Sequence, residues 1–119
     1  ICYTNVLTML GCDATKAVAP DGWPALFGMG TTCRDDADGT IYPAMDAIVP
    51  VFLNNYAVAL DAVAQVDDAV FARPTPDERF RSFLPTLGTV ALSMLNNHVS
   101  LHMGQMSAWR RCIGLGSVS

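Results

Sequence analysis

The sequence predicts an all-α protein, and three observations support that prediction. Apolar residues recur at steps of three and four in three separate segments, as they do on one face of a helix. Alternation with a period of two, which is typical of a half-buried strand, occurs in none of them. Hydrophobic residues make up 51% of the 119 residues and charged residues 15%, so the chain has enough apolar material for a globular core. We expect a single domain over residues 1–119.

The first helical segment covers residues 1–10. Cys2, Val6 and Leu10 fall on one helical face, and Gly11 then offers a stop. The helical pattern of apolar residues is already present at the first residue. We therefore expect that the chain begins inside a helix and that an upstream piece is missing.

Two connections rich in helix-breaking residues separate the helices. Between residues 12 and 43 no periodic segment of useful length occurs, apart from one turn near Pro24–Phe27. A connection of that length is expected to be ordered and tucked against the body of the protein. The second connection, residues 67–83, is broken by Pro74 and Pro76, and a short turn of helix is predicted from Asp77 to Phe83.

The second helix is predicted over residues 43–67. Its opening proline suits a first helical position, and Phe52, Tyr56 and Leu60 recur at steps of four. Pro50 lies inside this span. It either marks the true start of the helix or bends it near its beginning, because a proline ring clashes with the carbonyl four residues back.

The last helix is predicted from Thr86 to about Ile113, where Gly114 ends it. Its inward stripe consists of residues three or four positions apart: Leu87, Ala91, Met94, His98, Leu101, Gln105, Ala108 or Trp109, and Cys112. We expect Trp109 to pack inward, with the two arginines that follow it near the helix C-terminus, where the helix dipole favours positive charge. Long helices separated by connections predict an up-and-down bundle.

Composition argues against several classes of function. A net charge of −4 with scattered basic residues argues against nucleic acid as a partner. No run of about eighteen apolar residues occurs, so no membrane span is expected. The four cysteines, at positions 2, 12, 33 and 112, match no zinc-ribbon or redox spacing. We expect reduced thiols in a cytoplasmic protein.

The two histidines of the chain, His98 and His102, stand four positions apart in the last predicted helix. Residues at that spacing project from the same helical face, close enough to bind one ion. Neutral imidazole is a common ligand for zinc, nickel and iron. Gln105, one turn further on, is expected to support a metal ligand or to contact substrate. The alternative is that both rings are core residues, each satisfied by a carbonyl or a neighbouring side chain.

Zinc-protease chemistry is ruled out for this histidine pair. The H-E-x-x-H pattern needs a glutamate directly after the first histidine, and Val99 occupies that position. A catalytic zinc centre also needs a third protein ligand. That ligand must be an Asp, Glu or Cys, or it must lie outside this chain, because the sequence contains no third histidine.

Three stretches together resemble the DinB-like superfamily. "HVSLHMGQMSAWRRCIGL" is similar to the closing helix of that family, in which an H-x-x-x-H-x-G-Q motif precedes a Trp-Arg-Arg segment. "DGWPALFGMGTT" and "PTPDERFRSFLPTLG" resemble connections in one branch of the family, in matching order. The similarity covers nearly all of the chain.

The resemblance implies an up-and-down four-helix bundle that binds a divalent metal ion through three histidines. Two of them correspond to His98 and His102, and the third falls about three residues before Ile1, so the first helix of the bundle would be missing here. Characterised relatives are metal-dependent transferases that use low-molecular-weight thiols, together with isomerases and hydrolases. A bound metal suits this chemistry, since it lowers the pKa of a thiol or a water molecule.

Two hypotheses of different class follow. The first is a divalent-metal-binding DinB-like protein acting on a small-molecule substrate, as a thiol-dependent transferase or a metal-dependent hydrolase. The second is a non-catalytic helical bundle that acts through dimerisation or small-ligand binding. A missing helix would leave an apolar surface uncovered. Because such surfaces are typical of protein interfaces, a homodimer is expected in either case.

Overall fold

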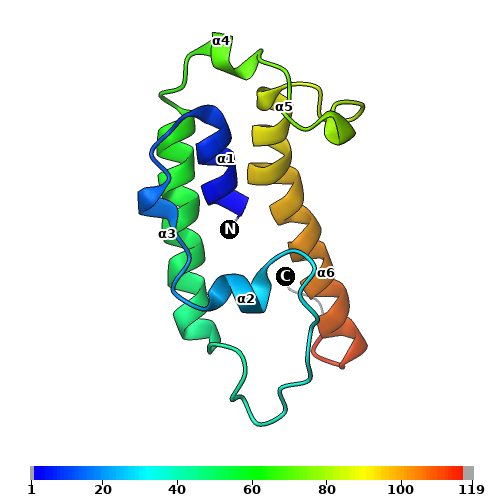
Figure 1. Ribbon diagram of the computed structural model, residues 1–119. Helices are drawn as coiled ribbons and strands as arrows, with labels where there is room; N and C mark the ends of the chain where they lie inside the picture. The colour runs from blue at the N-terminus through cyan, green and yellow to red at the C-terminus, as the bar shows by residue number, and fades with distance from the viewer. Residues whose placement is uncertain (1, 117–119) are drawn as a thin grey trace. The chain divides into compact units, whose positions relative to one another are not determined.

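The computed structural model describes residues 2–116 and contains no β-strand among them. The prediction of an all-α protein is therefore confirmed. The chain forms two compact units that divide between Val66 and Asp67 (Figure 1).

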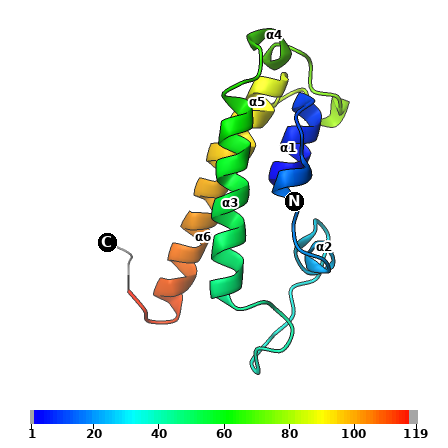
Figure 2. The ribbon, with the colours of Figure 1, turned by 90° about the vertical axis from the view of Figure 1, so that its left-hand side faces the viewer.

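In the first unit, helix α1 (Cys2–Leu10) packs along α3 (Met45–Val63), as Figures 1 and 2 show. As the sequence predicts, α1 stops at Gly11, whose φ of +76° is the left-handed conformation that commonly follows a helix. The face of α1 that packs inward is apolar, with four buried residues: Tyr3, Val6, Leu7 and Leu10. Burying a side chain such as Leu7, which has no exposed surface, stabilises the fold by about 1.5–3 kcal/mol.

Tyr3 connects α1 to two aromatic rings of α3. Its ring centroid lies 5.9 Å from that of Phe52 and 5.6 Å from that of Tyr56. Burial, together with the nearby Tyr56 and Cys2, raises the pKa of Tyr3 to about 12. The Tyr3 side chain is therefore a neutral core group.

The first connection is ordered, as expected. It contains a 3₁₀ turn, η1 (Thr15–Ala17), whose Ala17 is fully buried, and the short helix α2 (Trp23–Phe27), at the position where one turn was predicted. Its ordered conformation comes from short local contacts: for example, the Trp23 and Phe27 rings meet edge-on at 5.7 Å.

Asp36 closes the loop that precedes α3. One of its carboxylate oxygens accepts the backbone N–H groups of Thr40 and Ile41, and the other accepts that of Tyr42, each at 2.9 Å. The Tyr42 hydroxyl in turn accepts the Arg34 N–H at 2.9 Å. The backbone N–H groups, that of Tyr42 first, hold the pKa of Asp36 below its ordinary value, because they stabilise the carboxylate.

Helix α3 begins at Met45, so Pro50 lies inside it and does not mark its start. Because proline has no N–H, the Asp46 carbonyl lacks its usual helical donor. Among the residues that the structure describes, α3 is the one helix whose length and mean hydropathy of 1.2 would allow it to span a membrane. Core helices of other proteins have the same length and composition, so no membrane assignment follows.

The second unit starts with helix α4 (Asp68–Phe71) and a loop containing the 3₁₀ turn η2 (Glu78–Phe80). Thr75 holds this loop together and is only 3% exposed. Its N–H donates to the Pro85 carbonyl at 3.0 Å, and its hydroxyl donates to the Leu84 carbonyl. Arg81 Nε donates to the Thr75 carbonyl at 2.6 Å. The proline-rich connection is therefore an ordered loop held by hydrogen bonds to Thr75.

The last helix is confirmed as one continuous helix, which can be followed along its length in Figure 1. It consists of α5 (Leu87–Leu92), a π turn called η3 (Ser93–Asn97) and α6 (His98–Cys112). Thr86 and Thr89 form a capping box at its start, and Gly114, with φ of +80°, follows its end.

The predicted inward stripe of this last helix is mostly wrong. Of its members only Leu87 and Ala91 are buried, and none of those in α6 is; Val90 and Leu95, which the prediction did not include, are buried as well. Trp109 is 61% exposed, so the prediction that it packs inward is wrong. The physical reason is twofold. The π turn holds one extra residue, which rotates α6 by about 100° relative to α5. Within this unit, moreover, α5 packs on α4 whereas α6 continues beyond it.

Candidate metal centre

His98 and His102 lie one above the other at the start of α6. Their Nε2 atoms are 3.0 Å apart, their ring centroids 4.4 Å apart, and their ring planes meet at 89°. The α-helical spacing of four residues produces this stacking, because side chains at i and i+4 share a face. The two ring nitrogens therefore converge on one point beside the helix.

Gln105 contacts the outer side of the second ring. Its Oε1 lies 2.8 Å from Nδ1 of His102. An amide oxygen only accepts hydrogen bonds, so Nδ1 carries the hydrogen and the Nε2 of a neutral His102 carries the lone pair. At 3.0 Å the Nε2 of His98 then donates its hydrogen to that lone pair, because two lone pairs would repel each other. In this form the two Nε2 atoms share one proton.

The histidine pair fits two neighbouring ligand positions on a metal ion. Bonds from a divalent ion such as zinc to histidine nitrogen are about 2.0–2.1 Å long, so two such nitrogens lie about 3 Å apart at the right angle of an octahedral site and about 3.3 Å apart at a tetrahedral angle. The observed separation is 3.0 Å. Hydrogen bonding of the other ring nitrogen to an oxygen acceptor is also typical of metal-bound histidine, and Gln105 supplies it for His102.

The described residues place two possible metal ligands together, and no third one beside them. Within residues 2–116, no group of three or more His, Cys, Asp or Glu side chains lies close enough together to hold an ion. Cys112 is exposed at the end of α6, ten positions beyond His102. Asp77 forms an exposed ion pair with Arg79 at 2.6 Å, and the Arg79 side chain holds the pKa of that carboxyl below its ordinary value. That geometry fits a solvated turn.

Sequence reasoning missed the π turn that leads directly into His98. The backbone N–H of His98 bonds to the Ser93 carbonyl, five residues back, instead of the carbonyl four residues back. No residue type marks such a turn, and the apolar periodicity runs through it unchanged. Its position directly before the histidine pair is notable, since π turns are frequent beside functional sites.

No protein-family model, curated protein or solved structure matches this chain. What the histidine pair does must therefore be argued from its own chemistry.

Proposed function

We propose that this chain belongs to a divalent-metal-binding helical protein in which His98 and His102 are two of three ligands. Gln105 orients His102 and keeps its Nε2 lone pair directed at the ion. The supporting observation is the 3.0 Å separation of the two Nε2 atoms together with the hydrogen bond from His102 Nδ1 to Gln105.

The proposal includes the DinB-like four-helix arrangement that the sequence resembles. In that arrangement the third ligand is a histidine that is not among these 119 residues, and the protein is a cytoplasmic homodimer. Its substrate is a small molecule, and its activity is that of a thiol-dependent transferase or a metal-dependent hydrolase. Zinc, nickel or iron bound at such a site lowers the pKa of a thiol or a water molecule, so that a nucleophile forms near neutral pH.

A Co²⁺ titration of the purified protein, with Zn²⁺ competition, tests the metal site. The unaltered protein should develop visible cobalt bands that Zn²⁺ removes. The double variant His98→Ala/His102→Ala should bind more than about 100-fold more weakly. Met103→Ala is the matched control, since Met103 is an exposed α6 side chain (59%) outside the pair. Equal metal affinity of the double variant and the control would falsify the proposal.

A panel of low-molecular-weight thiols and electrophilic small molecules then tests the reaction. Turnover that requires both metal and thiol supports the transferase assignment. Turnover with metal alone supports hydrolysis.

One observation favours a second candidate function, a non-catalytic interaction module. Five large apolar side chains of α6 and its end are about half exposed or more: Leu101, Met103, Met106, Trp109 and Ile113. A run of this kind is typical of a protein-interaction surface. Sedimentation of the unaltered protein beside Trp109→Glu distinguishes the candidates. A dimer that the substitution dissociates, with no metal bound by either protein, supports the module.

A further inference from the structure

The face of α6 that carries the histidine pair continues beyond the pair as an apolar face. In an α-helix the side chains of His102, Trp109 and Ile113 point in nearly the same direction. Trp109 is 61% exposed, Ile113 is about half exposed, and no residue of α6 is buried. The opposite face of α6 is made of small or polar residues: Ser100, Gly104, Ser107 and Arg111.

Five residues of this face are spaced like the contact residues of a coiled coil. They follow one another at steps of four and three: His98, His102, Gln105, Trp109 and Cys112. That spacing keeps one side of a helix directed at a partner helix along its whole length. The face therefore fits another helix.

The histidine pair has the geometry of half a metal site. Its two Nε2 atoms are 3.0 Å apart, so two such pairs on opposite sides of one ion place four nitrogens at the corners of a square. Ni²⁺ and Cu²⁺ favour a square of nitrogen ligands. His102 is exposed and His98 is partly exposed, and no described residue adds a third ligand beside them. A second pair can therefore approach the first.

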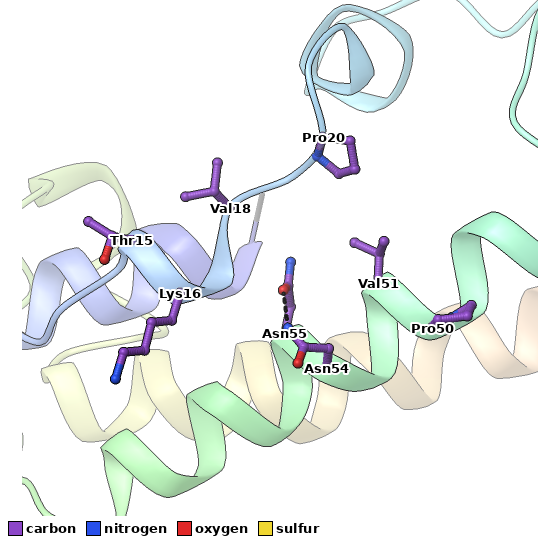
Figure 3. A pocket seen from close by; sticks show the side chains of 8 residues that line it. All are labelled: Thr15, Lys16, Val18, Pro20, Pro50, Val51, Asn54 and Asn55. Carbon is purple, nitrogen blue, oxygen red and sulfur yellow. Dashed lines mark hydrogen bonds between the residues drawn. The ribbon is translucent and has the colours of Figure 1, made fainter.

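Among the described residues, the first unit offers no comparable site for an ion. Its hollow of about 320 Å³ between η1 and α3, which Figure 3 shows, is lined by threonine, lysine, valine, proline and asparagine side chains. None of them is a histidine, a cysteine or a carboxylate, the side chains that commonly bind such ions.

We propose that the histidine pair binds a divalent ion together with the same pair of a second copy of this chain, in a dimer whose α6 helices run parallel. The inference rests on the proposed role of His98 and His102 as metal ligands. It takes the remaining ligands from the second copy instead of from a histidine outside these 119 residues. In each copy Gln105 keeps the Nε2 lone pair of His102 directed at the ion.

The parallel direction follows from where the apolar residues lie. Met106, Trp109 and Ile113 all come after the histidine pair, so a two-fold axis along the helices brings each of them against its own counterpart. An antiparallel arrangement around the ion would place them opposite α5 of the second copy. In α5, Leu87 and Val90 are already buried within their own unit. The parallel dimer thus removes more apolar surface from water.

Sedimentation velocity and a calorimetric titration with Ni²⁺ test the proposal on the unaltered protein. We expect a dimer that forms with one ion per two chains and dissociates when EDTA removes the ion. One ion bound by a monomer overturns this inference but leaves the two proposed metal ligands in place. No bound ion overturns both proposals. A dimer that is equally tight in EDTA also overturns the inference, because the ion then does not join the copies.

Three variants assign the contacts. His98→Ala/His102→Ala should abolish the Ni²⁺-dependent dimer. Trp109→Ala should weaken it at least about tenfold, since a tryptophan buried in an interface commonly dominates its affinity. Met103→Ala is the matched control, because the exposed Met103 side chain lies away from this face. Circular dichroism checks the helix content of each variant. The proposal fails if the double variant or Trp109→Ala dimerises like the control.

Cys112 tests the direction of the helices. In the parallel dimer it lies beside Cys112 of the second copy, whereas antiparallel pairing around the ion separates the two by about 36 Å along the axis. The background for this test is Cys2→Ser/Cys12→Ser/Cys33→Ser, which leaves one exposed thiol. A short bismaleimide should join two chains in Ni²⁺ and not in EDTA. A Ni²⁺ dimer that the reagent does not join overturns the parallel arrangement.

Discussion

The Nε2 atoms of His98 and His102 lie 3.0 Å apart, with the two rings nearly perpendicular. This is a specific arrangement, because a neutral pair at that distance must share a proton and the hydrogen bond to Gln105 determines which ring donates it. A cation that binds both nitrogens takes the place of that shared proton. The proposed metal site rests on this 3.0 Å separation of the two nitrogens.

Gln105 can be tested apart from the two ligands. Gln105→Leu removes the acceptor of the His102 Nδ1–H, so metal affinity should fall about 10–100-fold, as it does when such supporting groups are lost elsewhere. Gln105→Glu keeps an oxygen acceptor and should retain most of the affinity. Competition against a chelating dye measures both. Unchanged affinity of the leucine variant would show that Gln105 does not orient the ring.

Thr75 should be the polar residue on which the second unit depends most. Thr75→Val keeps the shape but removes the hydroxyl that donates to the Leu84 carbonyl. The Leu84 carbonyl then loses its donor beside a side chain that is only 3% exposed, at a cost of about 1–3 kcal/mol. Urea unfolding measures the loss. Thr75→Ser is the control and should lie closer to the unaltered protein, since the hydroxyl remains.

The loop closed by Asp36 should open in acid. The pKa of Asp36 is lower in the folded chain than in the unfolded one, so the carboxylate stabilises the loop above the unfolded value of about 4, and this contribution is lost as pH falls through the lower, folded pKa. The amide resonances of Thr40, Ile41 and Tyr42 should move together as pH is lowered. Asp36→Asn should remove this concerted movement. Independent midpoints for the three amides would contradict a shared carboxylate.

Substitution by alanine should have different effects on stability at two helical glycines, Gly104 and Gly88. A Cβ added at Gly104 meets nothing within 4 Å, so Gly104→Ala should stabilise α6 by about 0.5–1 kcal/mol through helix propensity. A Cβ at Gly88 would lie 3.3 Å from both the Cβ and the carbonyl oxygen of Phe71. Gly88→Ala should therefore gain nothing or destabilise the contact between α4 and α5. Thermal unfolding compares the two. A destabilised Gly104→Ala would indicate that another segment packs against α6 at that position.

The sequence alone determined the three long helical segments and two of their ends, but not the short helix α4, which lies in a predicted connection. Apolar periodicity located the three main helical segments, and Gly11 and Gly114 ended the first and the last of them. These features are local: a helix repeats every 3.6 residues, and a glycine after its last turn adopts a left-handed conformation without strain. The spacing of His98 and His102 is local in the same sense, and for that reason the pair could be named before any fold was known.

Only the tertiary structure decided which faces are covered and which atoms meet. Trp109 follows the helical stripe yet is exposed, because the π turn rotates α6 and no periodicity records an extra residue in one turn. Asn55 is polar yet buried, because η1, which is distant in sequence, packs on α3. Burial and hydrogen bonding depend on contacts between segments that are distant in sequence. Local sequence patterns do not show which segments those are.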